Sequence, residues 1–461
     1  MTVEWISFSD LVHKNIKTLE KGTTHAEAYF TMTETTEVAV RNSEILTQNR
    51  LTDAGVGFRV AIKNKVGFSC TNTLTEKALI NAGEKAVSIA RVSAKIPHFT
   101  LPGPGQRVTV KKTYDPQIAG ITVEEAVDVA QRLITAAEGF DPRVRAKSGR
   151  VVFQSGWRGI VNTLGVDHEE KETKAVLYLG GVGEYNGEVT GVCIDVEFSR
   201  TADISPEKVG EAVGEKVVKM VNPQPMKSFK GTCIFGPEAC SYQIADVLTD
   251  ALKGESVITG RSFWTGKIGE KVASEKFSVT DSALLENGFS SRGFDDEGCP
   301  SKDTALLKNG TLQSYLHNTT TAHALQMENT ANASRFPSGF DMVRSIIGKG
   351  YRTTPESFPS NLVIQPGDKS KEQLISEVEK GLVIESMAGF AQKGSGLISA
   401  QLSQAFFIQN GEIQYPVKGG MVSGVAFDWF NTISGVGNDV KQFDNAVVPS
   451  VRVEDVTVVG G

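Results

Sequence analysis

The fold of the N-terminal part is decided by two runs, EVAVRNSEILTQNRL at Glu37–Leu51 and GVGFRVAIKNKVGFSCTN at Gly55–Asn72. Both alternate apolar and polar residues, as strands with one buried face do. A helix-like segment precedes them. Another follows near Thr75–Ser93, where apolar residues recur every three to four positions after possible caps at Asn72 and Thr73. This order predicts a helix, a sheet and a second helix.

Two proline-containing stretches outside these strands have the composition of connectors: Pro97–Pro116, which contains LPGPGQ, and Val221–Lys230, with the sequence VNPQPMKSFK. Proline removes a backbone donor and glycine loosens the chain, so domain boundaries concentrate in such segments. They predict an N-terminal α/β domain at residues 1–96, a middle α+β domain at 117–220 and a β-rich C-terminal domain at 231–461.

The middle domain opens with a capping box, in which Glu125 follows Thr122 by three residues and starts an amphipathic helix. Strand-like segments come next, among them KAVLYLGG and GEVTGVCIDVEFS. Ser205 and Pro206 then supply an N-cap and a first-turn proline for a helix that ends near Met220. The middle domain is therefore expected to combine two helices with a sheet.

The C-terminal domain opens with the strand-like TCIFG and a helix expected from about Glu238 to Lys253, stopped by Gly254. The segments LLKNGTLQSYL and FFIQNGEIQYPV each place Asn-Gly between alternating apolar and polar residues, which predicts two hairpins. One further helix is expected from a cap at Ser370 to Gly381. The whole pattern predicts an α+β fold, with N-terminal helix and sheet domains followed by a β-rich C-terminal domain with a few helices.

Composition narrows the class of protein. The 461 residues carry 48 Lys and Arg against 54 Asp and Glu, a formal charge of −6, with no basic run that could displace counterions from a nucleic acid. No stretch approaches the roughly 20 apolar residues of a membrane-spanning helix, and the first residues lack the apolar core of a secretion signal. We expect a cytoplasmic protein that binds neither nucleic acid nor membrane.

The familiar metal-binding and nucleophilic motifs are absent. No pair among the six histidines has HExxH spacing, which places two His ligands and a Glu base on one helix. The His168-Glu169 pair lies in charged sequence typical of a surface, and His317 and His323 would need a carboxylate such as Glu328, in sequence typical of a loop. The five cysteines form no CxxC pair, no GxSxG is present, and no Ser or Cys has a neighbouring His.

Carboxylates cluster at Asp295, Asp296 and Glu297, within GFDDEGCPS. Such a cluster can bind a hard cation or act as acid and base. Aspartate beside glycine also builds turns by hydrogen-bonding its own backbone, so a structural loop is the favoured interpretation. The three residues are candidates for contact with a substrate or a partner, and no metal site is predicted.

Five segments together resemble one family over nearly the whole chain. They are DAGVGFRV at Asp53–Val60, GFSCTN at Gly67–Asn72, SRGFDDEG at Ser291–Gly298, NGEIQYPVKG at Asn410–Gly419 and PSVRVEDVTV at Pro449–Val458. Each motif alone is only moderately specific. Their order and spacing resemble the TldD/TldE (PmbA) metalloprotease family.

In that family the TldD subunit carries HExxxH on the helix that opens the C-terminal domain, where the histidines bind zinc and the Glu activates water. The corresponding helix here begins PEACSY, with Pro237 and Tyr242 at the ligand positions and Glu238 at the position of the base. Proline has no ligating side chain, and a phenol keeps its proton up to a pKa of about 10. The resemblance therefore implies a TldE-like chain, with Glu238 as a vestigial base and no metal or cofactor of its own.

The same resemblance implies a heterodimer with a TldD-like subunit that supplies zinc, acting on unfolded or modified peptides. Lys418, in the NGEIQYPVKG motif, is a further candidate for contact with substrate or partner. A homodimer is the alternative assembly when the chain is alone. Two other functions stay open: a self-sufficient hydrolase that uses an unrecognised site such as Asp295–Glu297, and a regulatory protein-binding protein of the DNA gyrase modulator type.

Overall fold

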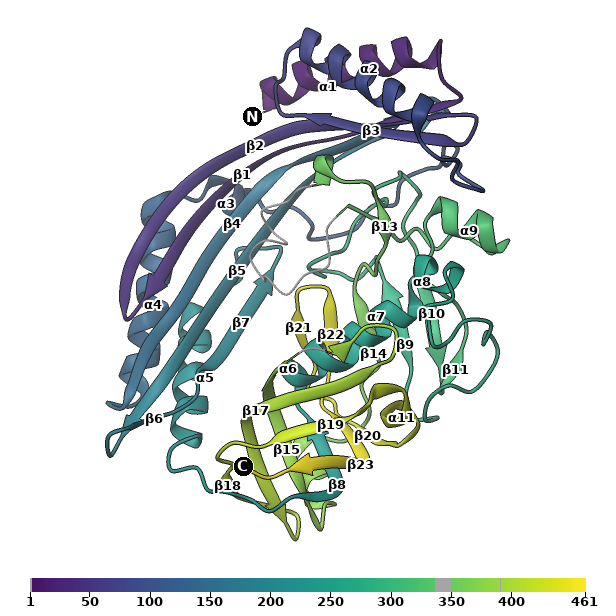
Figure 1. Cartoon of the computed structure of the whole chain (residues 1–461). Helices are drawn as coiled ribbons and strands as arrows, with labels where there is room; N and C mark the ends of the chain where they lie inside the picture. The colour runs from purple at the N-terminus through teal and green to yellow at the C-terminus, as the bar shows by residue number, and fades with distance from the viewer. Residues whose placement is uncertain (1, 336–349, 390) are drawn as a thin grey trace.

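The computed structural model describes residues 2–335, 350–389 and 391–461. Figure 1 shows a long, curved sheet with helices at one end and along its outer side, and a C-terminal lobe on its concave side. The C-terminal lobe is rich in strands and contains a few short helices. The predicted α+β class is therefore confirmed.

The N-terminal sheet is made of β1 (His25–Arg41), β2 (Glu44–Ile62), β3 (Lys65–Thr71), β4 (Val144–Asn162), β5 (Asp167–Tyr185), β6 (Glu188–Val189) and β7 (Cys193–Ser199). The strands are antiparallel in the order β3-β2-β1-β4-β5-β7, and β6 pairs with the end of β5. Because β1 pairs with β4 from Glu27 to Arg41, strands from the first and second parts of the sequence form one sheet.

The DAGVGFRV motif lies in β2, where its glycines have a steric role. A Cβ at Gly57 would overlap the carbonyl oxygen of Tyr351, and one at Gly55 would overlap the ring of Tyr351. The Tyr351 hydroxyl donates to Oδ1 of Asp53 at 3.1 Å, and Nη2 of Arg352 lies 2.6 Å from the same oxygen. The motif therefore seats residues of the C-terminal lobe directly on the N-terminal sheet.

Five helices pack on this sheet: α1 (Thr2–Glu20), α2 (Glu76–Val92), α3 (Pro116–Gly120), α4 (Val123–Phe140) and α5 (Pro206–Lys219). Helices α1 and α2 cover one end of the sheet, and α4 and α5 lie along its outer side (Figure 1). The capping box of Thr122 and Glu125 at the start of α4 is confirmed. The cap of α2 is Thr75, whose side chain accepts from the N–H of Ala78, and not Asn72 or Thr73.

Five strands of the C-terminal lobe pair into a closed ring: β8 (Phe229–Phe235), β15 (Lys380–Ala388), β17 (Leu397–Gln409), β19 (Met421–Val425) and β23 (Val451–Val459). Three more strands are added to it: β16 (Ala391–Gln392), β18 (Glu412–Pro416) and β20 (Ile433–Val436). Closure leaves each ring strand with two neighbours, so its backbone donors and acceptors are paired on both sides.

A second sheet contains β9 (Val279–Ser282), β10 (Asp303–Lys308), β11 (Thr311–Leu312), β14 (Leu362–Ile364), β21 (Lys441–Phe443) and β22 (Ala446–Val448), and β12 (Ala333–Ser334) pairs with β13 (Glu356–Ser357). Both predicted hairpins are confirmed, because Asn309-Gly310 joins β10 to β11 and Asn410-Gly411 joins β17 to β18. All four turn residues have positive φ, as a tight two-residue hairpin of this type requires.

The helical segments of the C-terminal lobe are α6 (Pro237–Ala239), the π-helical η1 (Cys240–Ala245), α7 (Asp246–Leu252), α8 (Gly254–Ile258), α9 (Thr319–Leu325), the 3₁₀ turn η2 (Gly350–Arg352), α10 (Lys371–Ser376) and α11 (Ala426–Asn431).

One predicted helix end in this lobe is confirmed and one is wrong. The helix that opens the lobe ends at Leu252 with Lys253 as its C-cap. Gly254 follows and begins the separate helix α8, where a Cβ would come within 2.7 Å of Thr321. The helix expected to reach Gly381 ends at Ser376, because Lys380–Ala388 pairs with β8 and β17 in the ring. Tertiary pairing overrides the local helical pattern there.

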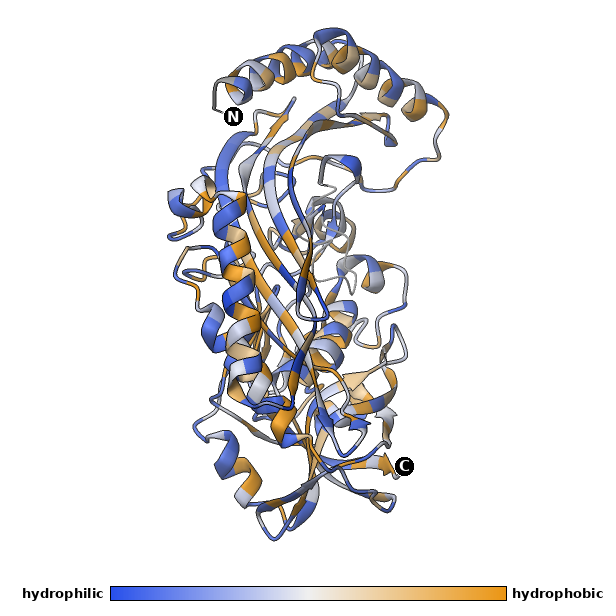
Figure 2. Cartoon of the chain, turned by 90° about the vertical axis from the view of Figure 1, so that its left-hand side faces the viewer, coloured by the Kyte–Doolittle hydropathy of each residue, from blue (hydrophilic) through white to orange (hydrophobic). Residues whose placement is uncertain are grey.

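Two large apolar cores join the layers. One fills the C-terminal lobe and reaches the N-terminal sheet through Val176, Val196 and Phe198. The other lies between α4, α5 and the outer face of the sheet, and includes Ile234 and Phe406 of the ring. Figure 2 shows hydrophobic and hydrophilic residues alternating around the outer helices. Among the described residues, no helix is long and apolar enough to cross a membrane.

Candidate functional site

The helix that opens the C-terminal lobe runs through α6, η1 and α7, with Pro237 as its first residue. Its middle section, Cys240–Ala245, is π-helical. A π turn joins residue i to residue i+5, and such turns are frequent at functional sites. The π section contains position 242 and begins three residues after position 237. These are the two positions that the resemblance assigns to metal ligands.

Glu238 is 7% exposed, and both of its carboxylate oxygens have polar neighbours. Oε1 accepts a hydrogen bond from Oγ of Ser386 at 2.7 Å, and Oε2 lies 3.8 Å from Nζ of Lys216. Burial raises the pKa of Glu238, and the charge of Lys216 opposes that rise. The carboxylate is thus held by a hydroxyl and an ammonium.

Lys216 belongs to α5, and its side chain connects Glu238 to β7, the strand at the edge of the N-terminal sheet. Its Nζ donates to the carbonyl oxygen of Ile194 at 2.5 Å and to Oδ1 of Asp195 at 2.8 Å. Oδ1 of Asp195 also accepts from Nζ of Lys441 at 2.9 Å. Lysines and carboxylates from both lobes therefore meet beside the first turn of α6.

The residues at the ligand positions do not fit a zinc ion. Tyr242 is half-buried, with its ring edge-on to that of Phe443 at 6.2 Å between centroids. Burial raises the pKa of the Tyr242 phenol, which disfavours the phenolate that a metal would need. Pro237 offers no ligand atom. Within the described residues, no group of three or more His, Cys, Asp or Glu side chains could hold a metal ion.

The acidic segment Asp295–Glu297 lies at the junction of the lobes, and its three residues have 0% exposure. Oδ1 of Asp296 accepts from Nη1 of Arg158 at 2.8 Å, and Oε1 of Glu297 accepts from Nη2 of Arg59 at 2.8 Å. Arg158 belongs to β4 and Arg59 to β2. These contacts therefore link a loop of the C-terminal lobe to the N-terminal sheet.

Further ion pairs extend this link. Nη2 of Arg59 donates to Oε2 of Glu27 at 2.9 Å, and Nη2 of Arg335 donates to the other oxygen of Glu27. Arg158 pairs with Glu170 of β5. Hydrogen bonds between guanidinium and carboxylate groups are among the stronger ones in proteins. We call this set the interlobe arginine network: Glu27, Arg59, Arg158, Glu170, Asp296, Glu297 and Arg335.

Asp295 is held by backbone groups. Its Oδ1 accepts from the N–H of Glu297 at 3.0 Å and of Cys299 at 2.9 Å, and its Oδ2 accepts from the N–H of Ala333 at 3.0 Å. This is the turn-building role typical of aspartate before a glycine. Burial, and then the charge of Glu297, raise the pKa of Asp295 from its usual 3.8 to about 7. The structure thus places the acidic segment inside the molecule, without contact with solvent.

The other candidates from the sequence lie apart from one another. Lys418 is exposed, and its Nζ is 3.4 Å from Oε1 of Glu188. His317 is buried, and burial lowers its pKa to about 4. His323 lies in α9, and its Nδ1 is 2.9 Å from the carbonyl oxygen of His98. Their separate contacts give these side chains no shared site.

One catalytic-looking arrangement was not visible in the sequence. Oγ of Ser9 lies 3.2 Å from Nδ1 of His13, and Nε2 of His13 lies 3.0 Å from Oδ1 of Asp167. The three residue types are those of a Ser-His-Asp triad, but there the serine contacts Nε2 and the aspartate contacts Nδ1. Ser9 is 7% exposed, however, and its hydroxyl donates to Glu169. The hydrogen bond to Asp167 raises the pKa of His13 to about 9, so this imidazole is protonated at neutral pH and is no base.

This cluster fastens α1 to β5. Glu169, expected on a solvated surface, accepts from Nε1 of Trp5 at 2.6 Å as well as from Ser9, so that expectation is wrong. The signal available in the sequence was the i, i+4 spacing of Ser9 and His13 in a helix, which places both side chains on one face. Asp167 is distant in sequence, and pairing across the fold brings it close.

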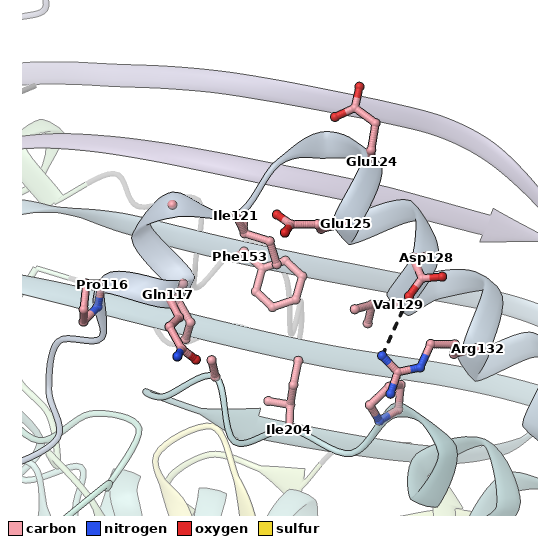
Figure 3. Close-up of a pocket in the computed structure, with 14 residues that line it drawn as sticks. Pro116, Gln117, Ile121, Glu124, Glu125, Asp128, Val129, Arg132, Phe153 and Ile204 are labelled. Carbon is pink, nitrogen blue, oxygen red and sulfur yellow. Dashed lines mark ion pairs between the residues drawn. The ribbon is translucent and has the colours of Figure 1, made fainter.

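A separate cavity of about 810 Å³ lies on the outer side of the N-terminal sheet. Figure 3 shows Phe153 and Ile204 among its apolar lining, with Glu125 and Asp128 on the first turns of α4 and an ion pair between Asp128 and Arg132. None of the candidates from the sequence lines this cavity.

Models of one family match three parts of the chain. They are described as the PmbA/TldA metallopeptidase domain 1, at residues 26–90, the central domain, at 116–221, and the C-terminal domain, at 228–460. The domain-1 and central-domain matches contain the strands of the N-terminal sheet, and the C-terminal match contains the ring and the helix that begins at Pro237.

Relatives share this family name. A metalloprotease of Methanothermobacter thermautotrophicus is 31% identical over 288 residues, which are 61% of this chain and 60% of that protein. The metalloprotease PmbA of Escherichia coli is 25% identical over 448 residues, which are 94% of this chain and 92% of that protein. The second alignment therefore extends over nearly the full length of both chains.

Solved structures show the same architecture. A Thermotoga maritima protein, named as a modulator of a DNA gyrase, is 26% identical with a TM-score of 0.86, covering 98% of this chain and 100% of that one. TldE from Thermococcus kodakarensis has a TM-score of 0.87 at 22% identity, with the same coverage, and shows the likeness of the fold. The three matched segments and the full-length relatives place this chain in the PmbA/TldD metallopeptidase family.

Proposed function

We propose that this chain is the TldE-like, non-hydrolytic subunit of a zinc metallopeptidase that acts on unfolded or modified peptides. The observation that supports this best is the helix of α6 and η1. It keeps Glu238, but Pro237 and Tyr242 stand at the ligand positions. Without a metal to lower the pKa of water from about 16 toward 7, hydrolysis at this helix is very slow. The zinc then belongs to a TldD-like partner with HExxxH.

Peptide binding is supported by a free sheet edge. Strand β3 pairs only with Val56–Ile62 of β2, so within the described residues the outer side of Glu44–Gly55 pairs with no strand. Leu46 and Leu51 on this stretch are 60% and 50% exposed. Extended peptides bind to such edges by adding a strand, with affinity from backbone hydrogen bonds that any sequence can form. This suits a protease that accepts unfolded chains.

The test is to express this chain with an HExxxH-bearing homologue from the same genome. We expect size-exclusion chromatography with light scattering to show one copy of each chain. Metal analysis should find zinc with the pair and no stoichiometric zinc with this chain alone. An unstructured fluorogenic peptide should be cleaved by the pair, and failure of the two chains to associate would reject the proposal.

Matched substitutions separate the roles of the two subunits. Glu→Gln in the HExxxH motif of the partner should abolish cleavage, because it removes the general base. Glu238→Gln in this chain should leave kcat within about two-fold, because no reacting group lies at Glu238. A fall in kcat of more than about tenfold in Glu238→Gln would instead make Glu238 a catalytic residue.

The other two functions correspond to other outcomes of the same experiment. Zinc bound by this chain alone, together with cleavage, would favour a self-sufficient hydrolase. Recovery of a topoisomerase in place of an HExxxH partner would favour the regulatory function suggested by the name of the Thermotoga maritima protein.

A further inference from the structure

The ammonium of Lys216 lies among three oxygen atoms beside the first turn of α6. Its Nζ is 2.5 Å from the carbonyl oxygen of Ile194, 2.8 Å from Oδ1 of Asp195 and 3.8 Å from Oε2 of Glu238. The ammonium donates hydrogen bonds to the first two oxygens and forms an ion pair with the third. Carboxylate and carbonyl oxygens are also the donors that a hard metal cation prefers.

The two carboxylates depend on this ammonium to different degrees. The side chains of Asp195 and Glu238 are 8% and 9% exposed, so an uncompensated charge on either is costly. Asp195 has a second cation, Lys441, at 2.9 Å. Among the described residues, the other polar contact of the Glu238 carboxylate is the neutral hydroxyl of Ser386 at 2.7 Å. Lys216 is therefore the cation that compensates Glu238.

We propose that Lys216 fills a cation site beside Glu238, so that the chain carries an internal ammonium at the helix whose ligand positions are Pro237 and Tyr242. The lysine keeps the site closed to metal ions and ties α5 to the C-terminal lobe. Removing the ammonium opens a weak site for a divalent cation, made of Asp195, Glu238 and the carbonyl of Ile194. This inference rests on the proposed loss of the zinc site, but it concerns cation binding and not peptide cleavage.

Thermal unfolding of the isolated full chain tests it. Lys216→Met removes the ammonium and keeps the apolar stem. Lys219→Met is the matched control, because this lysine is on the same helix but is 60% exposed and pairs with Glu215 on the surface. In the presence of EDTA we expect the Tm to fall by about 3–5 °C for Lys216→Met and by no more than about 1 °C for Lys219→Met.

Metal ions give the specific readout. About 1 mM Mn²⁺ or Zn²⁺ should raise the Tm of Lys216→Met by roughly 1–3 °C, and should leave the wild-type protein and Lys219→Met unchanged. Adding Glu238→Gln to Lys216→Met should remove this response. An absent response in Lys216→Met, or an equal rise in the wild-type protein, would overturn the proposal.

A second variant covers the case in which Lys216→Met does not fold. Lys216→Met with Glu238→Gln removes both charges, so it should fold with a higher Tm than Lys216→Met and respond to neither metal. If the double variant is no more stable than the single one, the ammonium does not compensate Glu238 and the proposal fails. These experiments use no partner, so the cation-site proposal can fail while the proposed function stands. The proposed function can likewise fail in the co-expression experiment while the cation-site proposal stands.

Discussion

The interlobe arginine network and the surroundings of Glu238 both bury carboxylates where the two lobes meet, but they compensate the charge differently. In the network the cations are guanidinium groups without access to water, since the side chains of Arg158 and Arg335 are 4% and 0% exposed. Beside Glu238 the cations are lysines at the margin of the interface, with Lys216 at 25% and Lys441 at 48% exposure.

This difference in chemistry separates a structural element from the cation site that we propose beside Glu238. Guanidinium is always charged and presents a rigid fork of donors, whereas ammonium is a point charge on a flexible stem. The arginine network is therefore suited to fix the lobes in one arrangement. Lys216, whose side chain is 25% exposed, is the cation whose place we expect a metal ion to take when the ammonium is removed. An acidic motif in the sequence, such as Asp295–Glu297, does not reveal whether its carboxylates are compensated by buried arginines or by a partly exposed lysine.

The largest effect is expected from breaking the network. Arg158→Met removes the guanidinium that donates to Asp296 and Glu170 and leaves Asp296 with the more distant Arg292, at 3.8 Å, so it should lower the apparent free energy of unfolding by about 3–5 kcal/mol. Arg132→Met, on α4, is the control, because Arg132 and its partner Glu207 are 46% and 49% exposed, and it should cost no more than about 1 kcal/mol. Urea denaturation measures both, and equal losses would contradict the structural role of the network.

A smaller effect is expected where the lobes touch without charge. Gly57→Ala places a Cβ against the carbonyl oxygen of Tyr351, and should cost about 1–3 kcal/mol of unfolding free energy. Gly120→Ala meets no atom within 4 Å and should be neutral within about 1 kcal/mol. Both are measured by urea denaturation. Full stability in Gly57→Ala would show that the two lobes are not in close contact at β2.

The comparison is sharpened by making one change in both regions. Glu297→Gln leaves two buried guanidinium groups, those of Arg59 and Arg335, to share the one carboxylate of Glu27, and should cost about 3 kcal/mol or more. Glu238→Gln should cost only about 1 kcal/mol, because Lys216 keeps Asp195 as its partner and the amide can still accept from Ser386. The difference in unfolding free energy between the two variants is the measurement. A larger loss for Glu238→Gln would reverse the proposed roles.

The smallest effect concerns pH. The pKa of His13 is raised to about 9 by Asp167, so the protonated imidazole stabilises the fold below about pH 6.5 and loses this contribution as the pH rises through 9. Asp167 is 61% exposed, so the gain is below about 1 kcal/mol. The Tm of wild type minus that of His13→Gln should be largest at pH 6 and shrink by pH 10. A constant difference would contradict the ion pair.

Local signals in the sequence predicted elements whose geometry is set by a few neighbouring residues. The Asn-Gly turns at 309–310 and 410–411 and the capping box of Thr122 and Glu125 are confirmed, because positive φ and side-chain caps are local requirements. The end of the helix after Ser370 was wrong, because pairing of Lys380–Ala388 within the ring competes with the helical pattern.

Contacts between distant residues could not be predicted in this way. The segment Asp295–Glu297 suggested a loop, and only the fold shows that Arg59 and Arg158, from strands far away in sequence, neutralise it. The proximity of Lys216 to Glu238 depends likewise on the meeting of α5 and α6 at the lobe junction. Neither pair has a spacing that periodicity could reveal.

The sequence by itself determined the class of fold, the likeness to the family, and the side chains that stand where zinc ligands would be required, because identity, order and spacing are properties of a linear chain. Only the tertiary structure decided which charges are compensated and by what. Burial and ion pairing depend on distances across the fold, and those distances are set when the curved sheet and the C-terminal lobe pack together.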